Sequence, residues 1–184
     1  MDAITLLKDD HSTVKGLFRR FESAGDNALE AKREIVDRII EELSVHSAIE
    51  EQLFYPAVRS AVEKAEGDVL ESLEEHHIVK WTLSELEGMD PKDERFDAKV
   101  AVLIESVRHH IDEEENGMFP KVRKAVGRKE LQELGEQMEE AKQAAPTRPH
   151  PRAPDQPPAN LILGPVAALL DAGKEALARV RGRK

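Results

Sequence analysis

Two segments of the chain, 64 residues apart, repeat one pattern of polar and aromatic residues. In each, a histidine is followed by glutamates four and five residues later, by an aromatic residue nine residues later and by a proline ten residues later, in His46–Pro56 and in His110–Pro120. A further histidine, directly preceded by an acidic residue, lies 35 residues before the first segment and 34 before the second, at His11 and His76. This repeat predicts two helical hairpins of one design that face each other in a bundle.

Apolar residues around these histidines recur every three or four positions, which is typical of helices packed along their length. Breaks that contain glycine separate four such segments, at 25–27, 67–68 and 88–91. The sequence therefore predicts an all-α, up-down four-helix bundle with a shorter extra helix at about 128–144 packed outside it. The predicted seams are Ile4, Leu7, His11, Val14, Phe18 and Phe21; Ile39, Leu43, His46, Glu50 and Leu53; Val69, Leu73, His76, Lys80 and Leu83; and Phe96, Val100, Leu103, Val107, His110 and Glu114.

Six ionisable residues interrupt the middles of these apolar seams. Burying an imidazole or a carboxylate without a partner costs several kcal/mol, so six such residues require a common partner, and a cation at the bundle centre meets this requirement. Residues four apart lie on one face of a helix, which aims the imidazole and the carboxylate of each repeat at a shared point. A metal-free set of buried His–Glu pairs is the alternative. The predicted metal ligands are His11, His46, Glu50, His76, His110 and Glu114.

Helical phase chooses between neighbouring candidates. His110 is in register with the apolar seam of its helix, whereas His109 points about 100° away. The same comparison favours His76 over His77 and favours Glu114 over the glutamates on either side of it.

The donor types indicate which metal the centre would hold. The chain contains no cysteine, which excludes thiolate zinc sites, iron–sulfur clusters, disulfides and a cysteine nucleophile. Mixed imidazole and carboxylate ligands suit iron or manganese. Because each half offers two histidines and one glutamate, we expect a dinuclear centre, most simply two iron ions about 3–4 Å apart that Glu50 and Glu114 bridge.

With these residues the chain resembles the hemerythrin-like family, in the branch called HHE cation-binding domains. The resemblance covers about residues 3–125 and rests on His11, His46-x-x-x-Glu50, His76 and His110-x-x-x-Glu114. The repeats also end on Tyr-Pro and Phe-Pro, as in the family. It implies a four-helix bundle around a non-heme di-iron centre, with the two glutamates as bridging carboxylates and an oxo or hydroxo bridge. Oxygen-carrying hemerythrins have a fifth histidine where this chain has Lys80, so reversible oxygen carriage is not expected.

Two histidines per iron would leave open positions for a small ligand. Catalase-like decomposition of hydrogen peroxide by a di-iron oxidoreductase is the favoured function. Binding or sensing of oxygen, nitric oxide or iron without turnover is the alternative, since the resemblance implies these roles as well. Iron storage has less support, because one chain of this size has no room for a mineral cavity.

Two further residues are candidate catalytic residues. Lys80 would stabilise a bound anion such as peroxide if it reached the cavity, or it would extend its stem from the seam into solvent. Tyr55, the only tyrosine, lies nine residues after His46, half a turn out of phase on a straight helix, although Pro56 can distort that turn. It is either a core aromatic residue, a phenolate ligand or a redox-active neighbour of the metal. Glu51 and Glu115 are candidate partners of the imidazoles.

A proline-rich run divides the chain. Residues 146–158 hold six of the ten prolines, which predicts a linker at 146–160 between a bundle domain at 1–145 and a short amphipathic, basic-ended helix at 161–184. Residues 1–145 carry a net charge of −14 and residues 146–184 a net charge of +4. We expect the last helix either to fold back on the acidic bundle or to bind a protein partner that the sequence does not identify.

Net charge and hydropathy indicate where the protein is located and which partners it does not bind. A net charge of −10 argues against a general nucleic-acid-binding protein, which needs basic residues to neutralise phosphates. No apolar run approaches the length of a membrane span, and the first residues do not resemble a signal peptide. Together with the absence of cysteine, these features predict a cytoplasmic protein.

Overall fold

The computed structural model describes residues 1–157 and residue 160. Those residues contain α-helices and two π-helical segments and no strand, so the predicted all-α class is confirmed. The elements are α1 (Ala3–Glu22), α2 (Leu29–Ile49), η1 (Glu50–Phe54), α3 (Tyr55–Ala61), α4 (Glu66–Glu87), α5 (Phe96–Glu113), η2 (Glu114–Met118), α6 (Phe119–Ala125) and α7 (Arg128–Lys142). The helix predicted at 161–184 lies outside the described residues.

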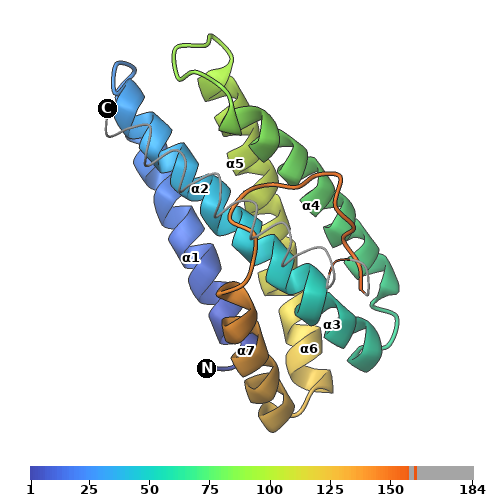
Figure 1. The fold of residues 1–184 in the computed structure, drawn as a ribbon. Helices are drawn as coiled ribbons and strands as arrows, with labels where there is room; N and C mark the ends of the chain where they lie inside the picture. The colour runs from blue at the N-terminus through green and yellow to red at the C-terminus, as the bar shows by residue number, and fades with distance from the viewer. Residues whose placement is uncertain (158–159, 161–184) are drawn as a thin grey trace.

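Four long rods run alongside one another and form the predicted up-down bundle (Figure 1). α1 and α2 form one hairpin, and α4 and α5 form the other. α2 continues through η1 into α3, and α5 continues through η2 into α6, so the two halves of the chain repeat in structure as they do in sequence. Within the described range, no helix is long and apolar enough to cross a membrane.

The apolar core consists of two clusters along the bundle axis. One cluster, which includes Val14, Leu43 and Val107, fills the half nearer the α1–α2 turn. The other, which includes Leu7 and Leu73, fills the half formed by α3, α6 and the start of α1. The six predicted metal ligands fall between the two clusters along every rod, and all are buried. A polar layer therefore crosses the bundle between two apolar halves.

Each half contains a π-helical segment that starts at its predicted bridging glutamate. In η1 the Tyr55 N–H donates to Glu50 O, and in η2 the Phe119 N–H donates to Glu114 O, both one residue longer than an α-helical bond. The extra residue shifts the helical phase, so that Tyr55 faces the bundle interior and is 1% exposed. The half-turn mismatch expected for Tyr55 on a straight helix is thus absent, and the following proline opens α3 at its first turn, where no N–H is needed.

The predicted fifth helix, α7, packs outside the bundle against α1. The buried residues of α7 are Leu131, Gly135 and Met138, which lie on the side that faces the N-terminal turn of α1. A Cβ at Gly135 would lie 2.4 Å from Met1 O, so only glycine permits this approach. At the other end of α7, Lys142 Nζ bonds Asp10 Oδ1 at 2.6 Å.

The proline-rich segment at 146–157, hereafter the strap, lies against the bundle and crosses α2 toward α4 (Figure 1). Its contacts with the bundle include a hydrogen bond from Arg59 to Gln156, a cation–π contact of Arg152 with Trp81 and an ion pair of Arg148 with Glu87. Beyond the strap, Asn160 Nδ2 donates to Glu51 O at 3.2 Å. Pro56 has no N–H to continue the π-helical pattern to Glu51 O, and the Asn160 amide reaches that carbonyl instead. The division into a bundle, a linker and a last helix stays a prediction.

Candidate metal centre

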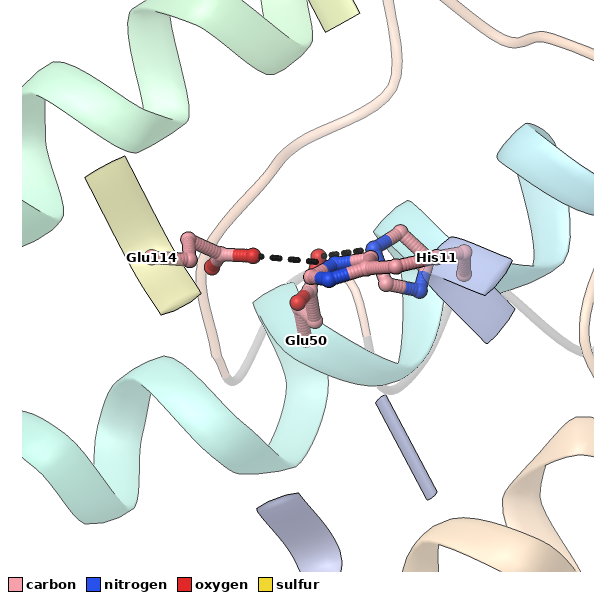
Figure 2. Close-up of side chains that lie close together, drawn as sticks. His11, Glu50 and Glu114 are labelled. Atoms are coloured by element: carbon pink, nitrogen blue, oxygen red, sulfur yellow. Dashed lines mark ion pairs between the residues drawn. The ribbon is translucent and has the colours of Figure 1, made fainter. Parts of the chain in front are cut away.

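Four helical rods each contribute to one buried cluster of imidazoles and carboxylates. His46 Nε2 lies 3.1 Å and His76 Nε2 3.3 Å from Glu50 Oε2. His11 Nε2 lies 3.3 Å and His110 Nε2 3.6 Å from Glu114 Oε2. Each carboxylate therefore contacts one histidine of its own hairpin and one of the other hairpin. Figure 2 shows Glu50 and Glu114 turned toward the ring of His11.

The ligand atoms fall into two groups that could each hold one ion. His11, His46, Glu50 and Glu114 form the first group, and Glu50, His76 and His110 form the second, with all ligand atoms of a group within 4.8 Å of one another. Glu50 belongs to both groups. This arrangement supports a dinuclear site in which a carboxylate spans two ions.

Acidic residues outside the cluster contact the outer nitrogen of three histidines by hydrogen bonds, and a fourth acidic residue lies near the outer nitrogen of His46. Glu115 contacts His11 Nδ1 at 3.0 Å and Glu51 contacts His76 Nδ1 at 3.0 Å, which agrees with the role expected for these two glutamates. Glu75 contacts His110 Nδ1 at 2.7 Å, and Asp10 lies 3.6 Å from His46 Nδ1. A proton on Nδ1 leaves the Nε2 lone pair facing the centre, as a metal-binding histidine requires.

Sequence reasoning missed the roles of Asp10 and Glu75. Both directly precede a ligand histidine, and each supports the second histidine of its own hairpin. Glu51 and Glu115 each directly follow a candidate metal-binding glutamate, and each contacts the first histidine of the other hairpin. The repeat contained this signal, since an acidic residue precedes both upstream histidines.

The structure also separates the neighbouring candidates. His76 and His110 are buried in the cluster, whereas His77 and His109 are exposed. His77 accepts a hydrogen bond from Trp81 Nε1, and His109 lies 3.3 Å from Glu113 on the surface.

Several buried ligand atoms make no hydrogen bond among the described residues. They are His11 Nε2, His46 Nε2, both Glu50 oxygens and Glu114 Oε2. Leaving such atoms unpaired in the interior costs about 1–3 kcal/mol each, more for charged groups. The unpaired atoms are lone-pair donors that converge from four rods, so a cation fits the cluster and a hydrophobic core does not.

The two central carboxyl groups respond differently to this environment. Burial, together with the nearby Glu114 charge, raises the pKa of Glu50 well above its usual range. Burial alone would also raise the pKa of Glu114, but His110 and His11 outweigh it and lower that pKa to about 2. In the metal-free cluster the pKa values of the two carboxyl groups are therefore shifted in opposite directions, which favours the protonated form of Glu50 and the ionised form of Glu114.

Tyr55 and Lys80 occupy different places around the cluster. Tyr55 Oη donates to Glu114 Oε1 at 3.1 Å and lies 3.2 Å from His76 Nε2, next to the second ligand group. Lys80 Nζ instead binds both oxygens of Glu51, at 2.7 and 2.9 Å, and reaches the centre only through Glu51 and His76. Its ammonium is buried in this ion pair and does not extend into solvent.

A cavity of about 20 Å³ adjoins the ligand nitrogens. All four histidines line it, together with apolar side chains that include Val79 and Val107. A water molecule needs about 10–15 Å³ measured in this way, so the cavity holds one ligand of very few atoms.

Comparisons with known proteins agree with this geometry. Residues 2–122 match the family model of the hemerythrin HHE cation-binding domain. An uncharacterised hemerythrin-like protein of Schizosaccharomyces pombe is 29% identical over 163 residues, 88% of this chain and 79% of that protein. A crystal structure of a hemerythrin HHE cation-binding domain-containing protein from Mycobacterium kansasii, 29% identical, superposes with a TM-score of 0.67 over 78% of this chain and 86% of that one.

A DNA nickase of Nostoc is also similar, 26% identical over 142 residues, which are 77% of this chain and 39% of the nickase. That the chain does not bind nucleic acid was inferred from its net charge alone and therefore stays a prediction, as does the cytoplasmic location. The family model covers the four rods and all six candidate ligands. The chain belongs to the hemerythrin HHE cation-binding domain family.

Proposed function

We propose that the chain holds two iron ions on His11, His46, Glu50, His76, His110 and Glu114 and decomposes hydrogen peroxide. The observation that carries this proposal is the cavity of about 20 Å³ bounded by all four imidazoles. It gives a small ligand room beside both ligand groups. Lys80, at the position of a fifth histidine, contacts Glu51 rather than the centre, so its side chain would not be a ligand of a bound ion.

The donor set suits iron, which accepts mixed imidazole and carboxylate ligands. When bound, a pair of iron ions supplies the two electrons that reduce one peroxide to water and takes two electrons from a second peroxide, which leaves as oxygen. Two peroxides thus give two waters and one oxygen, and no external reductant is needed.

The protein's own residues orient the imidazoles, exclude bulk water and hold a proton near the centre. Glu51, Glu75 and Glu115 fix the planes of three imidazoles by hydrogen bonds, Asp10 lies 3.6 Å from the fourth, and the apolar side chains around the cavity keep bulk water out. Burial and the charge of Glu114 raise the pKa of Tyr55 well above its usual range, so its hydroxyl stays protonated and donates to Glu114 Oε1. We assign Tyr55 as the residue that holds a proton beside the second ligand group.

Binding or sensing of oxygen or nitric oxide without turnover is the second candidate. It is favoured by the apolar lining of the cavity outside the four histidines, which suits an uncharged diatomic molecule. Nothing in the cavity lining except the histidines and Ser47 can donate a hydrogen bond to peroxide.

The test is oxygen evolution from hydrogen peroxide by the iron-loaded protein, compared with His110→Ala and Tyr55→Phe. We expect His110→Ala to abolish evolution and to halve the iron content, because His110 belongs to the second group only. Tyr55→Phe keeps the iron and lowers the rate. No evolution from a fully loaded wild type, together with a spectral change on adding nitric oxide or oxygen, would favour the binding function instead.

A further inference from the structure

A second cavity, of about 210 Å³, opens between α4 and the η2–α6 rod. Its charged lining residues are Asp68, Glu71, Glu113, Glu114 and Lys121, and Gly117 of η2 leaves room in its wall. We call it the acidic cavity. It has space for several water molecules, unlike the small cavity between the histidines.

Glu114, a candidate metal ligand that is 1% exposed, is among the residues that line the acidic cavity. Its Oε2 makes no hydrogen bond among the described residues and lies beside His11 Nε2. One residue therefore belongs both to the cavity lining and to the first ligand group. A cation that reached Glu114 from this side would already be at the centre.

The outer end of the cavity is negatively charged. Lys121 forms an ion pair with Asp68, which leaves the charges of Glu71 and Glu113 uncompensated by lysine or arginine among the described residues. Glu113 also belongs to an exposed group with Glu75 and His109, whose ligand atoms lie within 4.8 Å of one another and could hold a metal ion. Glu113 thus connects the cavity lining with a further exposed carboxyl group and an imidazole.

Another cavity near the centre has a different character. It lies beneath the strap, where Lys80 is paired with Glu51 and Arg148 lies 3.8 Å from Glu87. The charges there are paired, whereas the acidic cavity presents the carboxylates of Glu71 and Glu113 to an approaching cation. Low-dielectric walls focus such a field and raise the association rate of an oppositely charged ion.

We propose that the acidic cavity is the route by which divalent metal ions reach the centre, with Glu71 and Glu113 attracting the ion and Glu114 receiving it. This inference rests on the proposed metal centre but not on the proposed reaction with peroxide. The strap has no part in it, because the two attracting charges lie on α4 and at the end of α5.

The experiment is stopped-flow absorption of Co²⁺ uptake by the metal-free full-length protein at low and high salt. The variant Glu71→Gln/Glu113→Gln removes two charges at the mouth. The matched control Glu133→Gln/Glu136→Gln removes two charges from the exposed face of α7, away from the cavity. We expect the first variant to load about 3–10-fold more slowly at low salt, to converge on the wild-type rate at about 0.5 M salt, and to bind the same amount of metal. The control loads at the wild-type rate.

A second variant, Gly117→Leu, tests the route without changing charge. A Cβ at Gly117 meets no atom within 4 Å, so the side chain extends into the acidic cavity. We expect slower uptake at both salt concentrations with unchanged unfolding stability. Wild-type rates in both variants, or equal slowing in the α7 control, would overturn the proposed route. Failure of the wild type to bind Co²⁺ would overturn the centre as well, whereas a lack of peroxide activity would leave the uptake result standing.

Discussion

Glu51 contacts the candidate metal ligand His76, the ammonium of Lys80 and the amide of Asn160. Its carboxylate contacts His76 Nδ1 and Lys80 Nζ, and its backbone oxygen accepts a bond from Asn160. Burial raises the pKa of Glu51 to about 7 although Lys80 opposes the shift. Lys80, at the position where oxygen-carrying hemerythrins have a fifth histidine, therefore pairs with Glu51, and Glu51 in turn contacts the candidate ligand His76.

Replacing Lys80 by methionine should destabilise the metal-free protein in a pH-dependent way. A folded-state pKa of about 7 against the usual 4.5 means that the folded protein retains a proton that the unfolded chain loses, so ionisation of Glu51 reduces stability as pH rises through this range. Without Lys80 the buried carboxylate is unpaired, and we expect a loss of about 3 kcal/mol at pH 8 and much less at pH 5. Urea unfolding at both pH values measures it, with Lys80→Arg as the control that retains the charge. Equal losses at pH 5 and pH 8 would contradict this account of the pair.

Metal loading should release protons, because the pKa of Glu50 in the metal-free cluster is raised well above its usual range. Its raised pKa comes from burial and from Glu114, and a metal ligand must be deprotonated. We therefore expect the affinity for Co²⁺ to increase between pH 6 and pH 8. Isothermal calorimetry in two buffers of different ionisation enthalpy measures the protons released per ion. A binding heat that does not depend on the buffer would show that Glu50 is already ionised.

At the scale of the elements, the rods were predictable and the π-helical segments were not. Three-and-four spacing of apolar residues specifies which face of a helix is buried, and this fixed the placement of His110 over His109 in the prediction. A π-helical turn adds one residue without changing the residue types, so the spacing of the seam gave no sign of it. One indication of η1 was present in the sequence: on a straight helix Tyr55 would lie half a turn away from His46. The extra residue of the π-helical turn instead directs Tyr55 toward Glu114.

The docking of α7 depends on Gly135, which makes a direct test of that element possible. A Cβ there would lie 2.4 Å from Met1 O and 2.7 Å from Ala3 N, and backbone atoms cannot move aside cheaply. We expect Gly135→Ala to lower the free energy of unfolding by about 1–3 kcal/mol, measured by urea unfolding. Gly67→Ala is the matched control, because its Cβ meets no atom within 4 Å and alanine favours the helix by up to about 1 kcal/mol. A stable Gly135→Ala would mean that α7 packs less closely on α1 than the structure describes.

For the whole molecule, the repeat in the sequence was enough to predict how two hairpins share one centre. Identical spacing in both halves required the ligands to meet at one level of the bundle, between the two apolar clusters. The strap could not be predicted in the same way. Its prolines exclude a helix but do not specify which surface an extended segment covers, and its contacts with Trp81 and Arg59 have no counterpart in the repeat.

The sharing of ligands between hairpins makes the metal a cross-link of the whole bundle. Glu114 from the second hairpin completes the first group, and Glu50 from the first hairpin completes the second. Two ions, each at a hundred to a thousand times its dissociation constant, stabilise the folded state by about 5–8 kcal/mol. For a chain of this size we expect chelation to lower the melting temperature by about 10–20 °C, measured by differential scanning calorimetry. In Glu50→Gln the loaded and chelated proteins should melt together, because Glu50 serves both ions, whereas His110→Ala should keep about half of the difference. If His110→Ala also lost the whole difference, the two groups would bind as one unit and would not be separable sites.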